Sequence, residues 1–201
     1  LDRVLALTMN MLAYAKDRPL DIDLDQPNTT VREVAELLGA AARRKRLRLE
    51  VNLDPAMPAI PVDSAALHQA LVNLATNAIE AAPDRSGEVL IRTRFHPAGP
   101  AGPGHCEVTV EDNGPGIPAS RRGDLFQPFV STKGQRGTGL GLAVTLKLAQ
   151  QHGGSVVHED RPGGGTRMIL NLPAHSDDLD SERTRAPKPL AHGELGISFE
   201  E

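Results

Sequence analysis

The longest helical pattern in the chain lies between Asp63 and Pro83, and two different stripes of side chains run along it. Asp63 is a typical N-cap residue, and Pro83 ends the pattern because proline cannot continue a helix. Apolar side chains recur at the spacing of one helix face, at Leu67, Leu71, Leu74 and Ala78. This face predicts a helix that packs on a core formed by the rest of the chain.

Strand and helix patterns alternate around this helix. Strands are predicted by the runs RLRLEVNL, EVLIRTRF, CEVTVED, SVVHED and TRMILNL. One further helix is expected from a cap at Asn28 or Thr29 to about Arg44, and another from about Leu140 to His152, where Gly153 and Gly154 end it. The segments PAMPAIP and HPAGPAGPGH predict loops. Together these elements predict an α/β sandwich, with a mixed, mostly antiparallel sheet covered on one face by helices.

Four parts are expected along the chain. Residues 1–18 carry a seam typical of a helical bundle, at Leu1, Leu5, Thr8, Leu12 and Ala15. Residues 19–27 predict a linker, and residues 28–173 predict the folded domain. Residues 174–201 are charged and lack apolar periodicity, so we expect a disordered tail. Because the chain opens on Leu1 inside a helical pattern, we expect it to be a piece of a longer protein.

Composition excludes several classes of protein. The formal net charge is −4, which gives no reason to expect nucleic acid as a partner, and the basic run at 42–48 predicts the solvated end of a helix. One cysteine, Cys106, excludes an internal disulfide framework and fits a reducing cytoplasm. No apolar run approaches the ~18 residues that span a bilayer.

The second stripe on the long helix is polar. Asn73, Asn77 and Glu80 follow one another at i, i+4 and i+7, and asparagine is a poor helix former. One interpretation is a solvated helix face. The other is a site for a hard cation such as Mg²⁺, which prefers oxygen ligands and takes many of them from phosphate and water.

A turn with two glycines and two prolines, DNGPGIP, follows the strand pattern CEVTV. Gly114 and Gly116 allow close approach of a ligand or of another backbone, while Pro115 and Pro118 restrict the chain. An ordinary surface turn and a turn that presents the carboxylate of Asp112 are both compatible with this pattern.

Two more glycine-rich segments precede the last helix and the last strand. Gly134, Gly137, Gly139 and Gly141 lead into the helix that begins near Leu140. The free amides of a first helical turn can bind phosphate. Neither the P-loop pattern nor a dinucleotide fingerprint is present, so these glycines alone do not identify a ligand.

In order and spacing, five segments resemble the ATP-binding domain of two-component sensor histidine kinases, whose superfamily also includes gyrase, the heat-shock chaperone and MutL. They are the N box LVNLATNAIEAA, the G1 box DNGPGIP, the F box LFQPFVSTK, the G2 box GTGLGL and the G3 box GGGT. The resemblance covers residues 31–172 and implies the Bergerat ATP-binding fold. FQPFVSTK followed by GTGLGL resembles the nitrogen-regulatory subgroup.

The resemblance implies ATP and Mg²⁺ as ligands and a role for each matched residue. Asn77 would coordinate Mg²⁺ with support from Asn73, and Asp112 would accept a hydrogen bond from the adenine amine beside Thr166. Gly114 and Gly116 would let the base approach. Phosphate contacts would come from Thr132, Lys133, Gly137, Gly139, Leu140 and Gly141. For Phe126 and Phe129, core packing and gating by a lid both remain open.

One position separates kinases from ATPases in this superfamily. Hydrolytic members have a glutamate four residues before the magnesium asparagine, and Asn73 stands there in this chain. Asparagine cannot take a proton at neutral pH, so Asn73 favours phosphoryl transfer over hydrolysis.

In this kinase family the histidine that accepts phosphate stands in a characteristic sequence context, and none of the seven histidines here has that context. His158 comes nearest to it but is a decoy, because it lies in a predicted strand. Residues 1–18 resemble the end of the second helix of the dimerisation hairpin, so the acceptor would precede Leu1. The implied partners are that hairpin, a response regulator and a second kinase copy, with the domain in the cytoplasm. Alternatives are an anti-sigma type of serine kinase and a nucleotide-binding interaction module without kinase activity.

Overall fold

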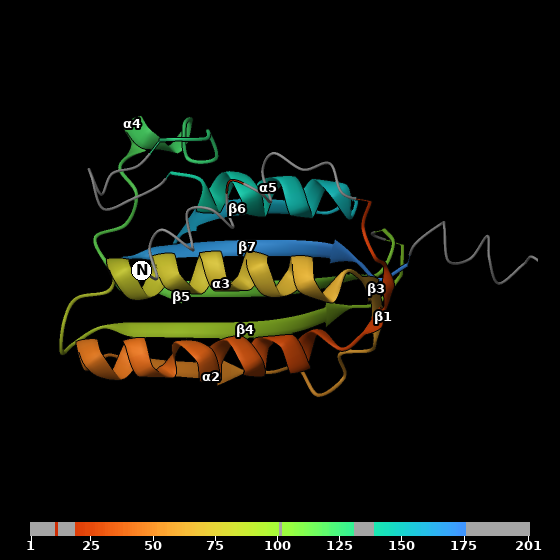
Figure 1. Ribbon diagram of the computed structural model, residues 1–201, viewed down its shortest axis with the longest axis horizontal. Coiled ribbons are helices and arrows are strands. Elements are labelled where there is room, and N and C mark those ends of the chain that lie inside the picture. Colours follow the sequence, from red (N-terminus) through yellow and green to blue (C-terminus); the bar gives the residue numbers. More distant parts are fainter. Residues whose placement is uncertain (1–10, 12–18, 101, 131–138, 176–201) are drawn as a thin grey trace, which may run out of the picture.

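The long helical pattern forms α3, Ser64–Ala81, at the centre of the fold (Figure 1). The computed structural model describes residues 11, 19–100, 102–130 and 139–175. The Asp63 carboxylate caps α3 by accepting a hydrogen bond from the Ala66 backbone N–H at 3.0 Å. The expected cap and the end of the helix before Pro83 are therefore confirmed.

Five strands form the main sheet in the order β2-β4-β5-β7-β6. They are β2, Arg48–Asn52; β4, Glu88–His96; β5, His105–Asp112; β6, Ser155–Asp160; and β7, Thr166–Pro173. β2 and β4 run parallel, and the other neighbours are antiparallel. All five predicted strands are present, and the sheet is mixed and mostly antiparallel as expected.

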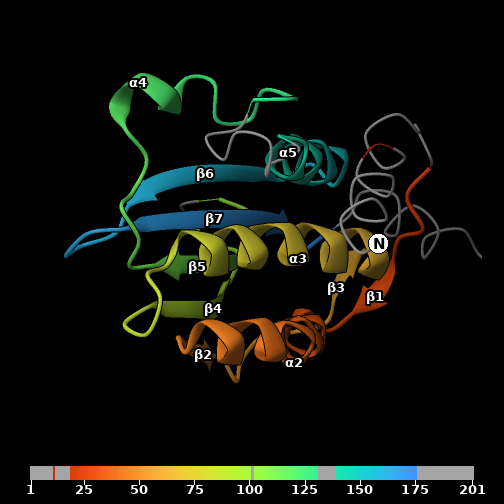
Figure 2. The same ribbon diagram turned by 60° about the vertical axis from the view of Figure 1, so that its left-hand side comes forward.

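Three helices cover one face of this sheet. α2, Pro27–Lys45, lies beside α3, and α5, Gly141–Gln151, lies on the other side of α3 (Figures 1 and 2). The core between the layers includes Leu71 and Leu74 from α3 and Val108 and Leu170 from the sheet, each at most 1% exposed. The α/β sandwich and the apolar face of α3 are confirmed.

Cys106 lies in the same core on β5 and is completely buried. Burial raises the pKa of its thiol to about 12, so the side chain stays protonated at neutral pH. Its role is to fill the core, and no chemistry is assigned to it.

Two short strands lie where we predicted a linker and a loop. β1, Asp23–Asp25, pairs antiparallel with β3, Ile60–Val62. Each strand has three residues, and Pro61 interrupts the second, so neither carries a readable alternation. Tertiary burial explains β3 instead, because Ile60 and Val62 are 0% exposed.

The start of α2 also differs from the prediction. The N-cap is Gln26, with Pro27 in the first turn, and neither Asn28 nor Thr29 caps the helix. The Asn28 side chain instead donates to the carbonyl oxygen of Asp54 at 2.9 Å and accepts from the Thr93 hydroxyl at 2.7 Å. This buried pairing uses the polar atoms that a cap would need.

The basic run at 42–48 is only partly the solvated helix end that we expected. Arg43 and Arg44 are exposed. Lys45 Nζ, however, donates to the carbonyl oxygens of Ile79, Glu80 and Ala82 at 2.9, 3.2 and 2.8 Å. These carbonyls lie at the end of α3, so one ammonium group donates to three of them and joins α2 to α3.

The expected bundle helix and tail, residues 1–18 and 174–201, lie almost entirely outside the described residues. Within the described part of the chain, no helix has both the length and the apolar character needed to cross a membrane.

Candidate functional site

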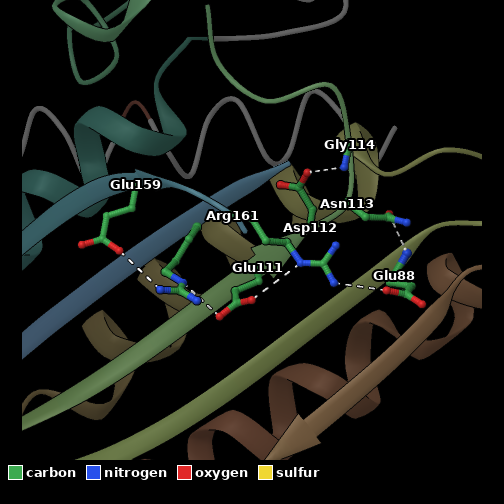
Figure 3. Close-up of polar contacts among 8 residues, drawn as sticks. Glu88, Glu111, Asp112, Asn113, Gly114, Glu159 and Arg161 are labelled. Carbon is green, nitrogen blue, oxygen red and sulfur yellow. Dashed lines mark hydrogen bonds and ion pairs between the residues drawn. The ribbon is translucent and has the colours of Figure 1, made fainter. Parts of the chain in front are cut away.

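Asp112 is the last residue of β5 and is 4% exposed. Oδ1 accepts a hydrogen bond from the Gly114 backbone N–H at 2.8 Å (Figure 3). Thr166 faces it as its partner in β7 and is also buried. The carboxylate is therefore fixed at the strand end. The interpretation of this segment as a turn that presents Asp112 to a ligand stays a prediction.

Burial raises the pKa of Asp112 above its usual range. Hydrogen bonds from Gly114 and Thr166 and the positive charge of Arg161 act in the opposite direction and favour the ionised carboxylate. A carboxylate that is held in place and largely removed from water is a selective acceptor, because few ligands present a matching donor.

Two glycine turns pack directly against Asp112. A Cβ at Gly114 would lie 2.7 Å from the Ala81 carbonyl oxygen and from Asp112 Oδ1. A Cβ at Gly165, which has a φ of +108°, would lie 1.9 Å from the Asp112 carbonyl oxygen. Gly116 approaches the second turn at Gly165. Only glycine allows the turns at 112–116 and 163–165 to meet at this point.

Asn113 clamps the first turn to the start of β4. Its Oδ1 accepts from the Glu88 backbone N–H at 2.8 Å, as Figure 3 shows, and its Nδ2 donates to the Ser86 carbonyl oxygen at 2.9 Å. Asn113 was not among the site residues expected from the sequence. Its place in an Asn-Gly pair was the only available signal, and that signal indicates a turn rather than a contact across strands.

A network of ion pairs lies beside Asp112 and was also missed. Glu111 is 6% exposed. Its Oε1 accepts a hydrogen bond from Arg167 Nε at 3.0 Å, and its Oε2 lies 3.7 Å from Arg161 Nε. Arg161 reaches Glu88, and Arg167 reaches Glu159. The register of β5 with β7 brings these residues together, and a single sequence does not reveal that register.

The polar stripe of α3 is not uniformly solvated. Asn73 is 8% exposed, and its Nδ2 donates to the Gly141 carbonyl oxygen at 3.1 Å. Its Oδ1 accepts from Gln69 Nε2 at 3.2 Å. Asn77 is half-buried, and Glu80 is exposed at the end of the stripe. For Asn73, the prediction of a merely solvated face is wrong, because this side chain joins α3 to the start of α5.

The end of the glycine-rich segment, just before α5, is in contact with the segment at Phe129. Leu140 is 1% exposed, and α5 begins at Gly141. Before it, Gly139 has a φ of +66° and its carbonyl oxygen accepts from the Phe129 backbone N–H at 3.0 Å. The four predicted residues Thr132, Lys133, Gly134 and Gly137 lie outside the described residues.

The two phenylalanines of the F box differ. Phe126 is partly buried and packs against the core. Phe129 is 67% exposed and has a φ of +66°, so core packing is the wrong interpretation for this residue. Gating by a lid remains a prediction for both.

His158 lies in β6 as expected, with its side chain 8% exposed. Burial lowers its pKa, and Arg122 of the short helix α4, Ala119–Arg122, acts in the same direction. The predicted strand position of His158 is confirmed, and its exclusion as the phosphoacceptor stays a prediction.

The described site residues form one line along α3. The turn that follows Asp112 meets the end of α3 where Gly114 approaches Ala81, while Asn73 meets α5 at Gly141. Eight residues of α helix separate Ala81 from Asn73, a rise of about 12 Å. A fixed acceptor at one end and a helix start at the other fit an elongated ligand with a base and phosphates. The Asn77 side-chain oxygen suits a hard cation between them.

Comparison with known proteins agrees with this arrangement. Residues 62–176 match the family model described as histidine kinase-, DNA gyrase B- and HSP90-like ATPase. The sensory histidine kinase/phosphatase NtrB of Azospirillum brasilense is 36% identical over 203 residues, which cover 97% of this chain and 50% of that protein. This chain thus spans about half the length of that relative.

Two solved structures are also similar. Full-length ShkA in complex with AMPPNP has a TM-score of 0.73 and 29% identity, covering 87% of this chain and 37% of ShkA. The histidine kinase ThkA in complex with the response regulator protein TrrA has a TM-score of 0.71 and 27% identity, covering 87% of this chain and 48% of ThkA. The chain therefore belongs to the histidine kinase-, DNA gyrase B- and HSP90-like ATPases and contains the ATP-binding catalytic domain of a sensor histidine kinase.

Proposed function

We propose that this domain binds ATP with Mg²⁺ and transfers the γ-phosphate to a histidine on a helical hairpin outside residues 28–173, for relay to an aspartate of a response regulator. One observation carries the proposal: the buried Asp112 carboxylate, fixed by Gly114 and Thr166, lies at one end of α3. The helix then leads through Asn77 and Asn73 to the start of α5.

Adenine recognition would depend on Asp112. The carboxylate, which accepts hydrogen bonds from Gly114 and Thr166, would also accept one from the exocyclic amine of the base. Guanine has a carbonyl group at that position. The guanine oxygen and the Asp112 carboxylate would then face each other as two acceptors, and a buried carboxylate oxygen would be left unpaired. Gly114 and Gly116 would keep side chains away from the ring, and Thr166 would support the carboxylate.

At the phosphate end, Asn77 would supply an oxygen ligand to Mg²⁺. Bound Mg²⁺ would neutralise part of the triphosphate charge. Asn73 would hold the start of α5 in place through Gly141. The backbone at Gly137, Gly139, Leu140 and Gly141, together with Thr132 and Lys133, would contact the phosphates.

The absence of a base at Asn73 supports transfer rather than hydrolysis. Its amide already donates to Gly141 and accepts from Gln69, and it cannot remove a proton from water. Catalysis would then depend on orientation and on neutralisation of charge. An Asn73→Glu variant should gain ATP hydrolysis, and a variant as inert as the wild type would contradict this role.

The partners follow from the class of kinase. A phosphoacceptor hairpin, a response regulator and a second kinase copy would act with this domain in the cytoplasm, where ATP is available. The crystal structure of ThkA in complex with the response regulator protein TrrA supports a response regulator as a partner.

The test is phosphotransfer in two steps. The chain, incubated with γ-labelled ATP, should retain no stable label by itself and should label a supplied hairpin that contains the acceptor histidine. Acid-labile label on that hairpin is the expected result. Acid-stable label on serine would favour a serine kinase, and ATP binding without any transfer would favour an interaction module.

A further inference from the structure

Arg161 joins three segments that surround Asp112. Its Nη2 lies 3.1 Å from Glu88 Oε2 on β4, and its Nε lies 3.7 Å from Glu111 Oε2 on β5 (Figure 3). Its backbone N–H donates to the Gly165 carbonyl oxygen at 3.2 Å, and its carbonyl oxygen accepts from the Gly164 N–H at 3.0 Å. One residue thus closes the glycine turn before Thr166 and links that turn to β4 and β5.

Arg167 provides a natural comparison. It also pairs with Glu111, at 3.0 Å, and its side chain is 28% exposed, close to the 24% of Arg161. Its second partner is Glu159 on β6, at 3.4 Å, on the side away from β4. Both arginines therefore neutralise the same buried carboxylate, but of the two only Arg161 ties the turn at 161–165 to β4.

We propose that Arg161 is a positioning residue for adenine binding, which holds the strand end that carries Asp112 and places a positive charge beside it without contacting the nucleotide. This inference rests on the proposed function, because it assigns Arg161 to the same adenine site. The two glycine turns explain how the effect reaches Asp112. Gly165 lies directly against the Asp112 backbone, so any movement of the turn moves the carboxylate.

The charge of Arg161 has a separate effect. Arg161 and Arg167 face Glu88, Glu111 and Glu159 at this end of the sheet, and α3, which packs on β5, contributes the exposed Glu80. Among these groups, Arg161 is the charge that lowers the pKa of Asp112 against the effect of burial. Loss of that charge should let Asp112 take up a proton at a higher pH, and a protonated carboxyl group is a poorer acceptor than a carboxylate.

The test compares Arg161→Gln with Arg167→Gln across pH. Adenosine is the probe, since it has no phosphate that titrates between pH 5 and pH 8, and binding is followed by NMR titration of the 201-residue chain. We expect Arg161→Gln to weaken adenosine binding by roughly tenfold at pH 7, the effect of losing one charge-assisted contact. We also expect the pH at which binding is half lost to move upward. Arg167→Gln should leave that pH unchanged.

Arg161→Lys keeps the positive charge but changes the shape of the side chain, so it separates the two effects. It also provides a second test if Arg161→Gln does not fold. It should retain the wild-type pH midpoint, because the ammonium group keeps the charge. Equal losses in Arg161→Gln and Arg167→Gln without a change in midpoint would show a merely structural role and overturn the inference. A shifted midpoint in Arg161→Lys would overturn it as well. If the wild type transfers phosphate from ATP but does not bind adenosine, the inference fails while the proposed function stands. If the wild type neither binds ATP nor transfers phosphate, the proposed function fails, and the inference fails with it.

Discussion

The Ala81 end of α3 and its middle, at Asn73, are built differently. At the Ala81 end, a buried carboxylate, two glycine turns, the Asn113 clamp and a network of ion pairs determine the positions of the polar atoms near Asp112. In the middle of the helix, the Asn73 amide links α3 to the start of α5 through the Gly141 carbonyl oxygen. Under the proposed function, base recognition would therefore depend on the folded sheet, whereas phosphate contacts would depend on the start of α5.

The largest expected effect comes from breaking the Asp112 end at Gly165. Gly165→Ala would place a Cβ 1.9 Å from the Asp112 carbonyl oxygen at a φ of +108°. We expect a loss of about 3 kcal/mol in the free energy of unfolding, together with loss of adenosine binding. Urea denaturation and NMR titration would measure both.

Gly163→Ala is the matched control for this substitution. Gly163 has a φ of +89°, but no atom of the described residues lies within 4 Å of the position that a Cβ would take there. Only backbone strain should remain, about 1 kcal/mol, with adenosine binding retained. Equal effects of the two substitutions would show that contact with Asp112 is unimportant.

Lys45 tests whether the end of α3 can be loosened without changing base selectivity. Lys45→Met removes the donor to three carbonyl oxygens at the end of the helix. We expect the free energy of unfolding to fall by about 2 kcal/mol, with the preference for ATP over GTP unchanged. Arg44→Met, at an exposed neighbour, should have little effect in the same denaturation experiment. A change in base preference would contradict the separation of stability from selectivity.

Asn73 tests the same comparison on the side where the phosphates are proposed to bind. Asn73→Ala should weaken binding of Mg²⁺–ATP by roughly tenfold, because one interaction that orders the start of α5 is lost, and should leave adenosine binding almost unchanged. Thr145→Val is the control, since Thr145 Oγ1 also donates to the Gly141 carbonyl oxygen, at 2.9 Å, but from within α5. Parallel losses of affinity for ATP and adenosine in Asn73→Ala would show that the contributions of Asn73 and of the Ala81 end of α3 are not separable.

The smallest effect concerns pH and stability. The pKa of Asp112 is raised in the folded protein, so its contribution to stability is fully present below the pKa of the unfolded chain and is lost as pH rises through the folded pKa. Asparagine in place of Asp112 does not titrate. The difference in the free energy of unfolding should therefore shift in favour of Asp112→Asn between pH 4 and pH 7, as measured by urea denaturation. A shift in favour of the wild type would contradict the raised pKa.

The elements that the sequence predicts correctly are those with a regular pattern over several residues. α3, β4 and β5 carry periodic apolar residues that become the core, and Asp112 stands out because glycine and proline surround it. β1 and β3 are too short for a pattern, so only tertiary pairing explains them.

The parts of the site that the sequence does not predict depend on strand register. Asn113, Arg161 and Arg167 meet their partners across strands, between 8 and 73 residues apart along the chain. Local patterns carry no information on such pairs. The contacts of Lys45 were also missed, because its acceptors lie at the end of another helix, 34 to 37 residues away along the chain.

Calorimetric titration of ATP and GTP into the wild type and Asp112→Asn tests the role of Asp112 as the adenine acceptor most directly. Glu107→Gln, which makes the same change of charge at the other end of β5, is the control. We predict that the wild type and Glu107→Gln bind ATP and not GTP, and that Asp112→Asn loses affinity for ATP by about 100-fold. Equal affinity of the wild type for ATP and GTP, or unchanged ATP binding by Asp112→Asn, would contradict the assignment of Asp112 as that acceptor.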